Sequence, residues 1–244
     1  MNFFTIRIAN INIGIRAEFH RSYRLLQDFV VDEEPAFTVQ CSVEDFDREA
    51  AEVEATYQID APADVRLEVS ALLRKISERL LSDRIFLIHG AAIALDGQAY
   101  LFTAPSGVGK TTHILKWLDH CPDAFVVNGD KPFILVPTDK GQPLVCGSPW
   151  SGKENMYTNT TVPLKSIILM ERSEDNHMEQ ISFAEAFPSL FQQVYRPDEP
   201  EKMQMTLHLL QALTPSVSFW RFQCNNFKED CFQVAYSALH GSSS

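Results

Sequence analysis

Several features that define common protein classes are scarce in this sequence. Five cysteines occur among its 244 residues and no two form a C-x-x-C pair, so a zinc ribbon or a disulfide scaffold is disfavoured and a reducing cytosol is expected. No apolar run approaches the roughly 20 residues that span a bilayer. Polar residues interrupt the apolar ones throughout residues 1–16, which argues against a signal peptide. We therefore expect a cytoplasmic protein that has no membrane-spanning segment.

Positive charge is also in short supply. The chain has 21 Lys and Arg against 32 Asp and Glu, a formal net charge of −11. Such a field repels a polyanionic backbone, so nucleic-acid binding is not expected, although a local cationic site for one nucleotide remains compatible with it. Apolar residues make up 45% of the chain, which is enough for a packed core. At about 150 residues per domain, the length predicts one large domain, or one domain with a small appendage.

The first 62 residues indicate a β-rich accessory module. Isoleucine alternates with polar or small residues over positions 11–15, which is typical of a half-buried strand. The isoleucines of positions 6–8 have the opposite parity, which predicts a bulge or turn near residues 9–10. An acid-rich stretch with short strand-like pieces then runs from residue 32 to residue 62. We expect a domain boundary there, with the main domain spanning residues 63–244.

The main domain shows a mixture of helical and strand periodicities. Helices are expected over residues 64–81, after Lys110 with one apolar face formed by Ile114, Leu115 and Leu118, from the S-x-x-E capping box at Ser182, between Asp198 and Thr214, and before Gly241. Strands are expected over residues 85–95 and 99–102, turned at Asp96-Gly97, and over residues 124–127, 133–136, 144–146, 164–170 and 217–224.

The strongest motif is A-P-S-G-V-G-K-T-T at residues 104–112. It matches the phosphate-binding pattern G-x-x-x-x-G-K-[ST], except that Ala104 stands at the position of the first glycine. Gly107 and Gly109 permit the tight backbone path whose N–H groups face phosphate oxygens. A strand precedes the loop and an amphipathic helix follows it, as such a loop requires. The sequence therefore predicts a binding site for a nucleoside triphosphate.

Two side chains of this motif have specific expected roles. The Lys110 ammonium reaches the β- and γ-phosphates, and the Thr111 hydroxyl is a candidate Mg²⁺ ligand. The helix that begins near Lys110 adds the positive end of its dipole. The residues expected to contact ATP are Pro105, Ser106, Gly107, Val108, Gly109, Lys110, Thr111 and Thr112.

The segments around the loop resemble one family. H-G-A-A at residues 89–92, the D-G hairpin turn and the motif at residues 104–112 are similar to the HPr kinase/phosphorylase family and its small HPr-kinase-like relatives. That family shares its nucleotide-binding fold with phosphoenolpyruvate carboxykinases. The resemblance covers about residues 84–239 and implies a mixed-sheet α/β P-loop domain. It also implies an ATP- and Mg²⁺-dependent kinase that phosphorylates a hydroxyl of a protein, a peptide or a small molecule.

The same resemblance points to an acidic residue. V-V-N-G-D at residues 126–130 lies where the family carries a strand that ends in an acidic pair, one member of which binds metal or accepts the substrate proton. Gly129 occupies the first position here, so Asp130 is left as metal ligand, base or both. On the residues alone, Asn128-Gly129 fits a hairpin turn between strands 124–127 and 133–136 equally well.

A second lysine and a histidine complete the candidate set. G-S-P-W-S-G-K-E at residues 147–154 resembles a loop of the small kinase-like relatives, and Lys153 would neutralise charge on the transferring phosphoryl group opposite Lys110. A solvent-exposed loop with an incidental lysine is the alternative. His89 matches the family's His-Gly and would bond the γ-phosphate or tune Asp130; a purely structural histidine is the alternative.

Two other functions remain open at this stage. I-I-L-M-E at residues 167–171 also fits a Walker-B strand, in which Glu171 would polarise water in an ATPase switch; a buried strand that ends in a surface acid is the simpler interpretation. A nucleotide sensor without catalysis is the third function class. Oxaloacetate decarboxylation is not expected, because that branch of the superfamily has much longer chains. The expected partners are ATP and one hydroxyl-bearing substrate, with no nucleic acid and no membrane, and a homo-oligomer is left open.

Overall fold

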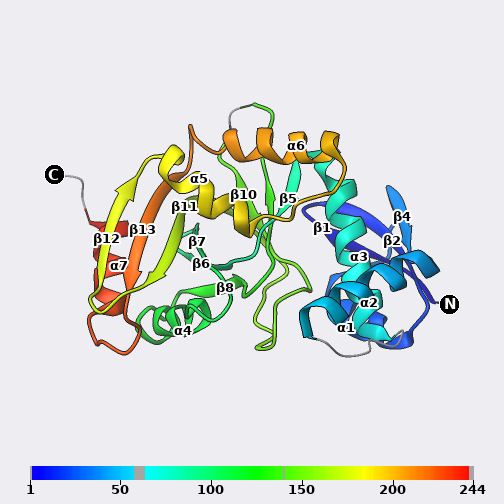
Figure 1. The fold of residues 1–244 in the computed structure, drawn as a ribbon, viewed down its shortest axis with the longest axis horizontal. Helices are drawn as coiled ribbons and strands as arrows, with labels where there is room; N and C mark the ends of the chain where they lie inside the picture. Colours follow the sequence, from blue (N-terminus) through cyan, green and yellow to red (C-terminus); the bar gives the residue numbers. More distant parts are fainter. Residues whose placement is uncertain (1, 58–63, 140, 242–244) are drawn as a thin grey trace. The chain divides into compact units, whose positions relative to one another are not determined.

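Two sheets organise the computed structural model, which describes residues 2–57, 64–139 and 141–241 (Figure 1). The first sheet and its helices belong to a unit that spans Met1–Asp83, and the second belongs to a unit that spans Arg84–Ser244. The chain is thus a mixed α/β protein with a β-rich N-terminal part. Each unit is described separately below.

The first sheet has the strand order β3-β1-β2-β4. Strands β1 (Asn2–Ile8) and β2 (Ile11–Ala17) form an antiparallel hairpin. The predicted turn is confirmed, since Ala9 and Asn10 connect the two strands with φ values of 49° and 65°. The other elements of this unit are β3 (Val30–Val31), β4 (Phe37–Gln40), α1 (His20–Leu26), α2 (Val43–Tyr57), α3 (Val65–Leu80) and the 3₁₀ turns η1 (Gln27–Phe29) and η2 (Leu81–Asp83).

The two left-handed residues at 9 and 10 are what a two-residue turn of this hand requires, and asparagine tolerates that conformation better than most residues.

Helix α3 is confirmed where the periodicity places it, but it belongs to the first unit, so the division lies at Asp83–Arg84 and not after residue 62. Its Glu68 accepts hydrogen bonds from the backbone N–H groups of Glu18 (2.5 Å) and Phe19 (3.2 Å). Arg74 of the same helix pairs with Asp45 and Glu49 of α2. Helix α2 lies in the stretch that was expected to form part of a β element. These contacts fix α3 to the first sheet's unit.

The second sheet has nine strands, in the order β5-β9-β10-β11-β7-β6-β8, with β13 beside β11 and β12 beside β13. Strand β11 pairs in parallel with β7 and β13, and the other pairings described in this sheet are antiparallel. The expected mixed sheet is therefore present. Its strands are β5 (Ile85–Leu87), β6 (Ala91–Leu95), β7 (Gln98–Thr103), β8 (Phe125–Asn128), β9 (Phe133–Leu135), β10 (Leu144–Cys146), β11 (Thr161–Arg172), β12 (His177–Ile181) and β13 (Ser218–Cys224).

Two strand predictions have different outcomes. The hairpin of β6 and β7 is confirmed, with Asp96 (φ 52°) and Gly97 (φ 71°) at its turn, although β5 is a separate strand that pairs with β9. The hairpin interpretation of Asn128-Gly129 is wrong: β8 pairs with β6, whereas β9 pairs with β5 and β10. The segment after β8 is therefore free to carry a site.

Four helices are described in the second unit: α4 (Lys110–His120), α5 (Phe183–Gln193), α6 (Pro200–Gln211) and α7 (Cys231–His240). The capping box of Ser182 and Glu185 is confirmed at α5, whereas α6 begins after Glu199 and not after Asp198. Leu115 is 45% exposed, because Trp117 takes the buried position on α4.

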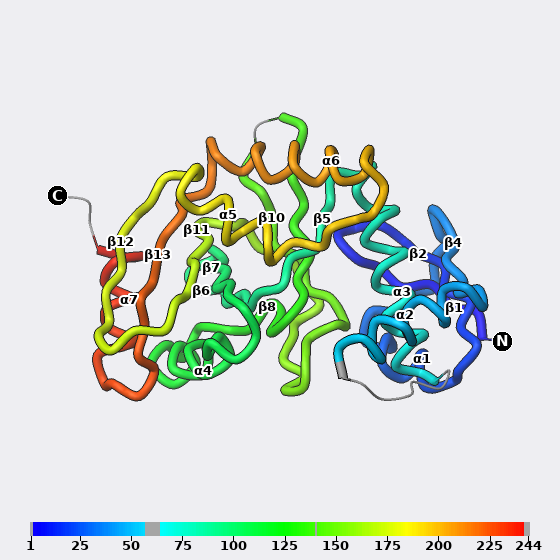
Figure 2. The backbone as a smooth tube through the Cα atoms, viewed as in Figure 1, coloured from blue at the N-terminus to red at the C-terminus, as the bar shows by residue number. Residues whose placement is uncertain are grey.

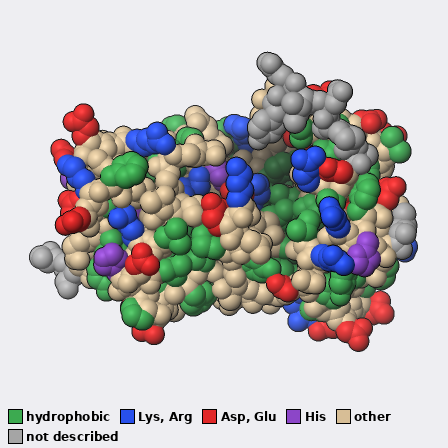
Figure 3. Space-filling model, turned by 90° about the horizontal axis from the view of Figure 1, so that it is seen from below, with side chains coloured by type: hydrophobic (Ala, Val, Ile, Leu, Met, Phe, Trp, Pro, Cys, Tyr) green, Lys and Arg blue, Asp and Glu red, His purple; other side chains and the backbone are tan. Residues whose placement is uncertain are grey.

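Helices α4 and α7 pack around one core of the second unit (Figure 2). Trp117 is fully buried there, with its ring centroid 5.5 Å from those of both Tyr100 and Phe232. No helix among residues 2–57, 64–139 and 141–241 has the length and apolar character needed to traverse a lipid bilayer. On the face seen in Figure 3, Lys and Arg side chains are interspersed with Asp and Glu.

Candidate active site

The glycine-rich loop joins β7 to α4 in the second unit. Gly107 (φ 83°) and Gly109 (φ 113°) both have left-handed backbone conformations that favour glycine. A Cβ atom at Gly109 would also lie 2.4 Å from Asn226 Nδ2, so a side chain at this position would displace Asn226 as well as strain the backbone. Ala104, which replaces the first glycine of the motif, is 3% exposed and packs in the core. The methyl group that alanine adds at this position is therefore accommodated in the core.

Lys110 is the first residue of α4 and is buried against the loop. Its Nζ donates to the carbonyl oxygens of Ala104 (2.8 Å) and Pro105 (3.4 Å). Burial lowers the pKa of its ammonium group. Two of the three ammonium donors are accounted for by these bonds, which leaves one for an oxygen of a ligand.

Two side chains from distant parts of the chain hold the outside of the loop. Arg172 donates to the carbonyl oxygen of Gly107, and Asn226 Nδ2 donates to that of Gly109 at 3.1 Å. In a planar trans peptide the carbonyl and the following N–H point in opposite directions. The N–H groups of Val108 and Lys110 therefore point away from these two side chains, toward the other side of the loop.

A buried chain of hydrogen bonds extends from the core to Asn226. Trp117 Nε1 donates to His113 Nε2 at 3.0 Å, so the ring proton of a neutral His113 lies on Nδ1, which is 3.5 Å from Cys231 Sγ. The Cys231 thiol in turn donates to Asn226 Oδ1 at 3.4 Å. Burial lowers the pKa of His113 to about 3 and raises that of Cys231 to about 12. Both groups are thus neutral near pH 7.

A second cluster forms where β8 ends. Asp130 Oδ1 lies 3.3 Å from His89 Nε2, and Asp130 Oδ2 lies 2.7 Å from Lys131 Nζ. Asn128 Oδ1 accepts from the backbone N–H groups of Asp130 (2.9 Å) and Lys131 (2.7 Å), which fixes the turn. Burial raises the pKa of Asp130, but the hydrogen bond from His89 and the charge of Lys131 outweigh it and lower the pKa to about 2. Asp130 is therefore ionised at neutral pH.

His89 connects this cluster to the strand that leads into the loop. Its Nδ1 lies 3.0 Å from Gln193 Oε1, and its carbonyl oxygen accepts from Thr103 Oγ1 at 2.7 Å. Thr103 is the last residue of β7. The neighbouring Gly90 N–H donates to the Asp130 carbonyl oxygen at 2.8 Å. His89 and Asp130 are thus in direct contact, and His89 is bonded to the end of the strand that leads into the loop.

The remaining candidates are placed less tightly. Thr111 is half-buried and Thr112 is exposed on the first turn of α4, and Lys153 is exposed on its own loop. That loop nevertheless packs on the cluster, because a Cβ atom at Gly152 would lie 3.1 Å from Asp130 Cβ. No group of three or more His, Cys, Asp or Glu side chains suited to a metal occurs among the described residues. The hydroxyl of Thr111 and the carboxylate of Asp130 are oxygen donors, which fits Mg²⁺ held together with a nucleotide and water.

Glu171 lies at the same end of the sheet as the loop. It follows Met170 in β11, whose Leu169 is opposite Thr103 in the parallel pairing with β7. Its side chain is exposed and lies 3.7 Å from Arg221. A pocket of about 170 Å³ is lined by residues 103–105 and 169–171 together with Ser189, Gln192 and Gln193.

The comparisons with known proteins give little at the sequence level. No family model matches the chain, and no curated protein matches it. Among solved structures, it is similar to the HPr(Ser) kinase/phosphatase from Coxiella burnetii, with 11% identity and a TM-score of 0.31 over 50% of this chain and 86% of that one. At that level of agreement, the function has to be argued from this chain's own residues.

Arg172, Asn226 and Gln193 were not among the site residues predicted from the sequence. They lie far along the chain from the residues they support, and no spacing pattern links them to the motif. Asn225-Asn226 before a helix was the only local signal, because asparagine commonly forms side-chain to backbone bonds in turns.

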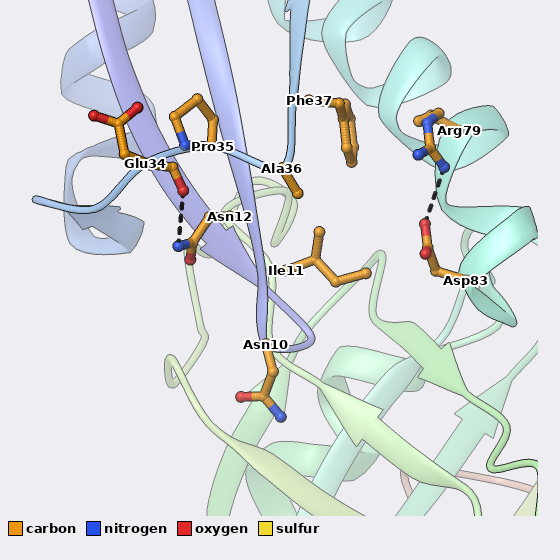
Figure 4. Close-up of a pocket in the computed structure, with 9 residues that line it drawn as sticks. All are labelled: Asn10, Ile11, Asn12, Glu34, Pro35, Ala36, Phe37, Arg79 and Asp83. Carbon is orange, nitrogen blue, oxygen red and sulfur yellow. Dashed lines mark hydrogen bonds and ion pairs between the residues drawn. The ribbon is translucent and has the colours of Figure 1, made fainter.

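One further pocket lies in the first unit, away from all these residues in the sequence (Figure 4). It measures about 340 Å³ and is lined by Asn10, Ile11, Asn12, Glu34, Pro35, Ala36, Phe37, Arg79 and Asp83. Arg79 donates to Asp83 at 3.0 Å and lies 4.7 Å from the centre of the Phe37 ring. Its charge is therefore already engaged, and none of the residues predicted for the active site lines this pocket.

Proposed function

We propose that this chain is an ATP-dependent kinase that transfers the γ-phosphoryl group to a hydroxyl acceptor. The observation that carries the proposal is the strand–loop–helix from β7 to α4, with buried Lys110 at its turn and the His89–Asp130 pair bonded to the same strand end through Thr103. Phosphoryl transfer depends mainly on positioning and on neutralising charge. Both are available from these side chains.

The residues divide the work in the following way. The N–H groups of the loop and the Lys110 ammonium bind the phosphates, and Thr111 with Asp130 would hold Mg²⁺. Bound Mg²⁺ would supply further neutralisation of the phosphate charge. Lys153, on the loop that packs against Asp130, would approach the equatorial oxygens of the transferred group.

Asp130 is better suited to orient the acceptor hydroxyl than to deprotonate it early. A carboxylate with a pKa of about 2 is a weak general base, because base strength follows the pKa. A loose transition state needs little proton removal before the phosphorus–oxygen bond to the leaving group is broken. We therefore assign Asp130 the roles of metal ligand and orienting group, with late acceptance of the proton.

A second function is favoured by one observation. Glu171 is the penultimate residue of β11, the parallel neighbour of the loop strand, which is close to the place of a water-polarising acid in an ATPase switch. Its 3.7 Å contact with Arg221 competes with that role. The kinase proposal is preferred because Asp130, unlike Glu171, has an oriented histidine partner.

The test uses purified protein, Mg²⁺ and γ-labelled ATP, with free serine, HPr, peptides and a small-molecule extract as acceptors. Label on an acceptor supports the kinase, label only in free phosphate supports the ATPase, and binding without turnover supports a nucleotide sensor. Lys110→Ala should abolish turnover, whereas Lys116→Ala, on the same helix, should retain it. Turnover that survives Lys110→Ala would show that the loop is not the site.

A further inference from the structure

A pocket of about 520 Å³ lies on the outer side of the glycine loop, where no residue of the proposed mechanism has been assigned except those of the loop itself. Three segments line it: Gly107, Val108, Gly109 and Thr112; Arg172 and Ser173 at the end of β11; and Cys224, Asn225, Asn226 and Phe227 at the end of β13. Its volume is in the range of about 300–1,000 Å³ that small-molecule sites occupy.

Phe227 stands out among the lining residues, because its side chain is 99% exposed, more than that of any other large apolar residue described. Its backbone is nevertheless fixed. The Phe227 N–H donates to Asn225 Oδ1 at 3.0 Å, and the adjacent Asn226 is bonded to the Gly109 carbonyl oxygen at 3.1 Å. The Phe227 ring therefore does not contribute to the core and projects into solvent from a fixed turn beside the glycine-rich loop.

Polar groups of several kinds accompany the ring. Arg172 and Asn226 reach the loop carbonyls from this side, and Ser173 contributes a hydroxyl. Asn225 is held in place, because its N–H donates to Asn176 Oδ1 (2.6 Å) and its Nδ2 donates to the Glu174 carbonyl oxygen (3.1 Å). An aromatic plane with a few fixed polar groups is suited to a flat heterocycle that carries ring nitrogens and exocyclic groups.

We infer that this pocket binds the base and ribose of the nucleotide whose phosphates the loop holds, with the base stacked on Phe227. The inference rests on the proposed function, since it requires a nucleotide at the loop. Stacking explains why a large apolar ring is left in solvent on a rigid turn. The contact is tolerant of base identity, because every base has a π-face.

The experiment compares the affinities of ATP and of tripolyphosphate, which lacks base and ribose, by titration calorimetry with Mg²⁺. Base–aromatic stacking is worth roughly 1–3 kcal/mol, so Phe227→Ala should weaken ATP binding by about fivefold to a hundredfold and leave tripolyphosphate binding unchanged. The fold is not at risk, because the Phe227 side chain contacts almost nothing. Leu115→Ala, another exposed apolar residue on α4, is the matched control and should change neither affinity.

A spectroscopic variant gives a second readout. In Phe227→Trp the new indole should be quenched by ATP and not by tripolyphosphate, relative to the wild-type protein. Unchanged ATP affinity in Phe227→Ala, or equal weakening of both ligands, would overturn the base subsite while leaving the kinase proposal intact. Failure of the wild-type protein to bind either ligand would instead overturn the proposed function, and with it the inference.

Discussion

Acidification should destabilise the second unit through His113, and the size of the effect follows from its burial. The ring is completely buried, and burial lowers its pKa from 6.5 to about 3. Below pH 6.5 the unfolded chain therefore binds a proton that the folded chain excludes. The free energy of unfolding then falls with falling pH by about 1.4 kcal/mol per unit, which amounts to about 2.5 kcal/mol between pH 7 and pH 4.5.

Two other groups of the second unit bear on the pH dependence of its stability. Asp130 has a lowered pKa of about 2, so its stabilising contribution is present above the unfolded value of 3.8 and is lost only at lower pH. Burial also lowers the pKa of His240, which adds a loss of the same sign. A residual slope is therefore expected when His113 alone is replaced.

The assay is urea unfolding at a series of pH values, followed by tryptophan fluorescence. All three tryptophans, Trp117, Trp150 and Trp220, lie in the second unit, so the signal reports that unit alone. His113→Gln should reduce the pH slope between pH 4.5 and 6.5, whereas His177→Gln, at an exposed position on β12, should preserve it. An undiminished slope in His113→Gln would refute the buried neutral histidine.

Three further predictions concern the candidate active site. Asp130→Asn should reduce phosphoryl transfer by at least a hundredfold while nucleotide binding stays measurable by thermal shift, and full activity would remove Asp130 from the mechanism. Asn226→Ala should weaken binding of both ATP and tripolyphosphate by about fivefold in calorimetry, because one hydrogen bond to the Gly109 carbonyl oxygen is lost. Gln233→Ala, on the exposed face of α7, is the control, and an equal effect of both substitutions would contradict the role of Asn226 in supporting the loop. Gly107→Ala should lower the free energy of unfolding by about 1–2 kcal/mol through backbone strain alone. Gly109→Ala should lower it further, because its Cβ would meet Asn226 at 2.4 Å, and equal urea midpoints for the two variants would disprove that clash.

Much of the local structure could be predicted because its interactions join residues close in sequence. Asp64 caps α3 by accepting from the N–H groups of Arg66 and Leu67, and the Asp96-Gly97 turn closes its hairpin. Helix α2 carried a similar signal that was overlooked: Ser42 and Asp45 bond each other's backbone N–H groups, as in a capping box. The acid-rich stretch that contains α2 was expected to be part of a β element, and Arg74 of α3 pairs with two of its acids, Asp45 and Glu49, only after folding.

In the candidate site, too, the residues that are close in sequence could be predicted and the distant ones could not. The loop and Lys110 are contiguous, so one motif contained them. The supports of Gly107 and Gly109 come from residues 65 and 117 positions further along the chain, and the partner of His89, Gln193, is 104 positions away. Such contacts depend on strand order in the sheet, which periodicity does not encode.

The distant origin of these supports sets an order of events during synthesis. The hairpin of β6 and β7 and the helix α4 are complete once residue 120 has left the ribosome, whereas Asn226 follows roughly 100 residues later, which takes about 5–20 s at ordinary elongation rates. Throughout that interval the Gly109 carbonyl oxygen lacks its hydrogen bond from the Asn226 side chain. The glycine loop therefore gains this support only after β13 and the turn that follows it have been synthesised.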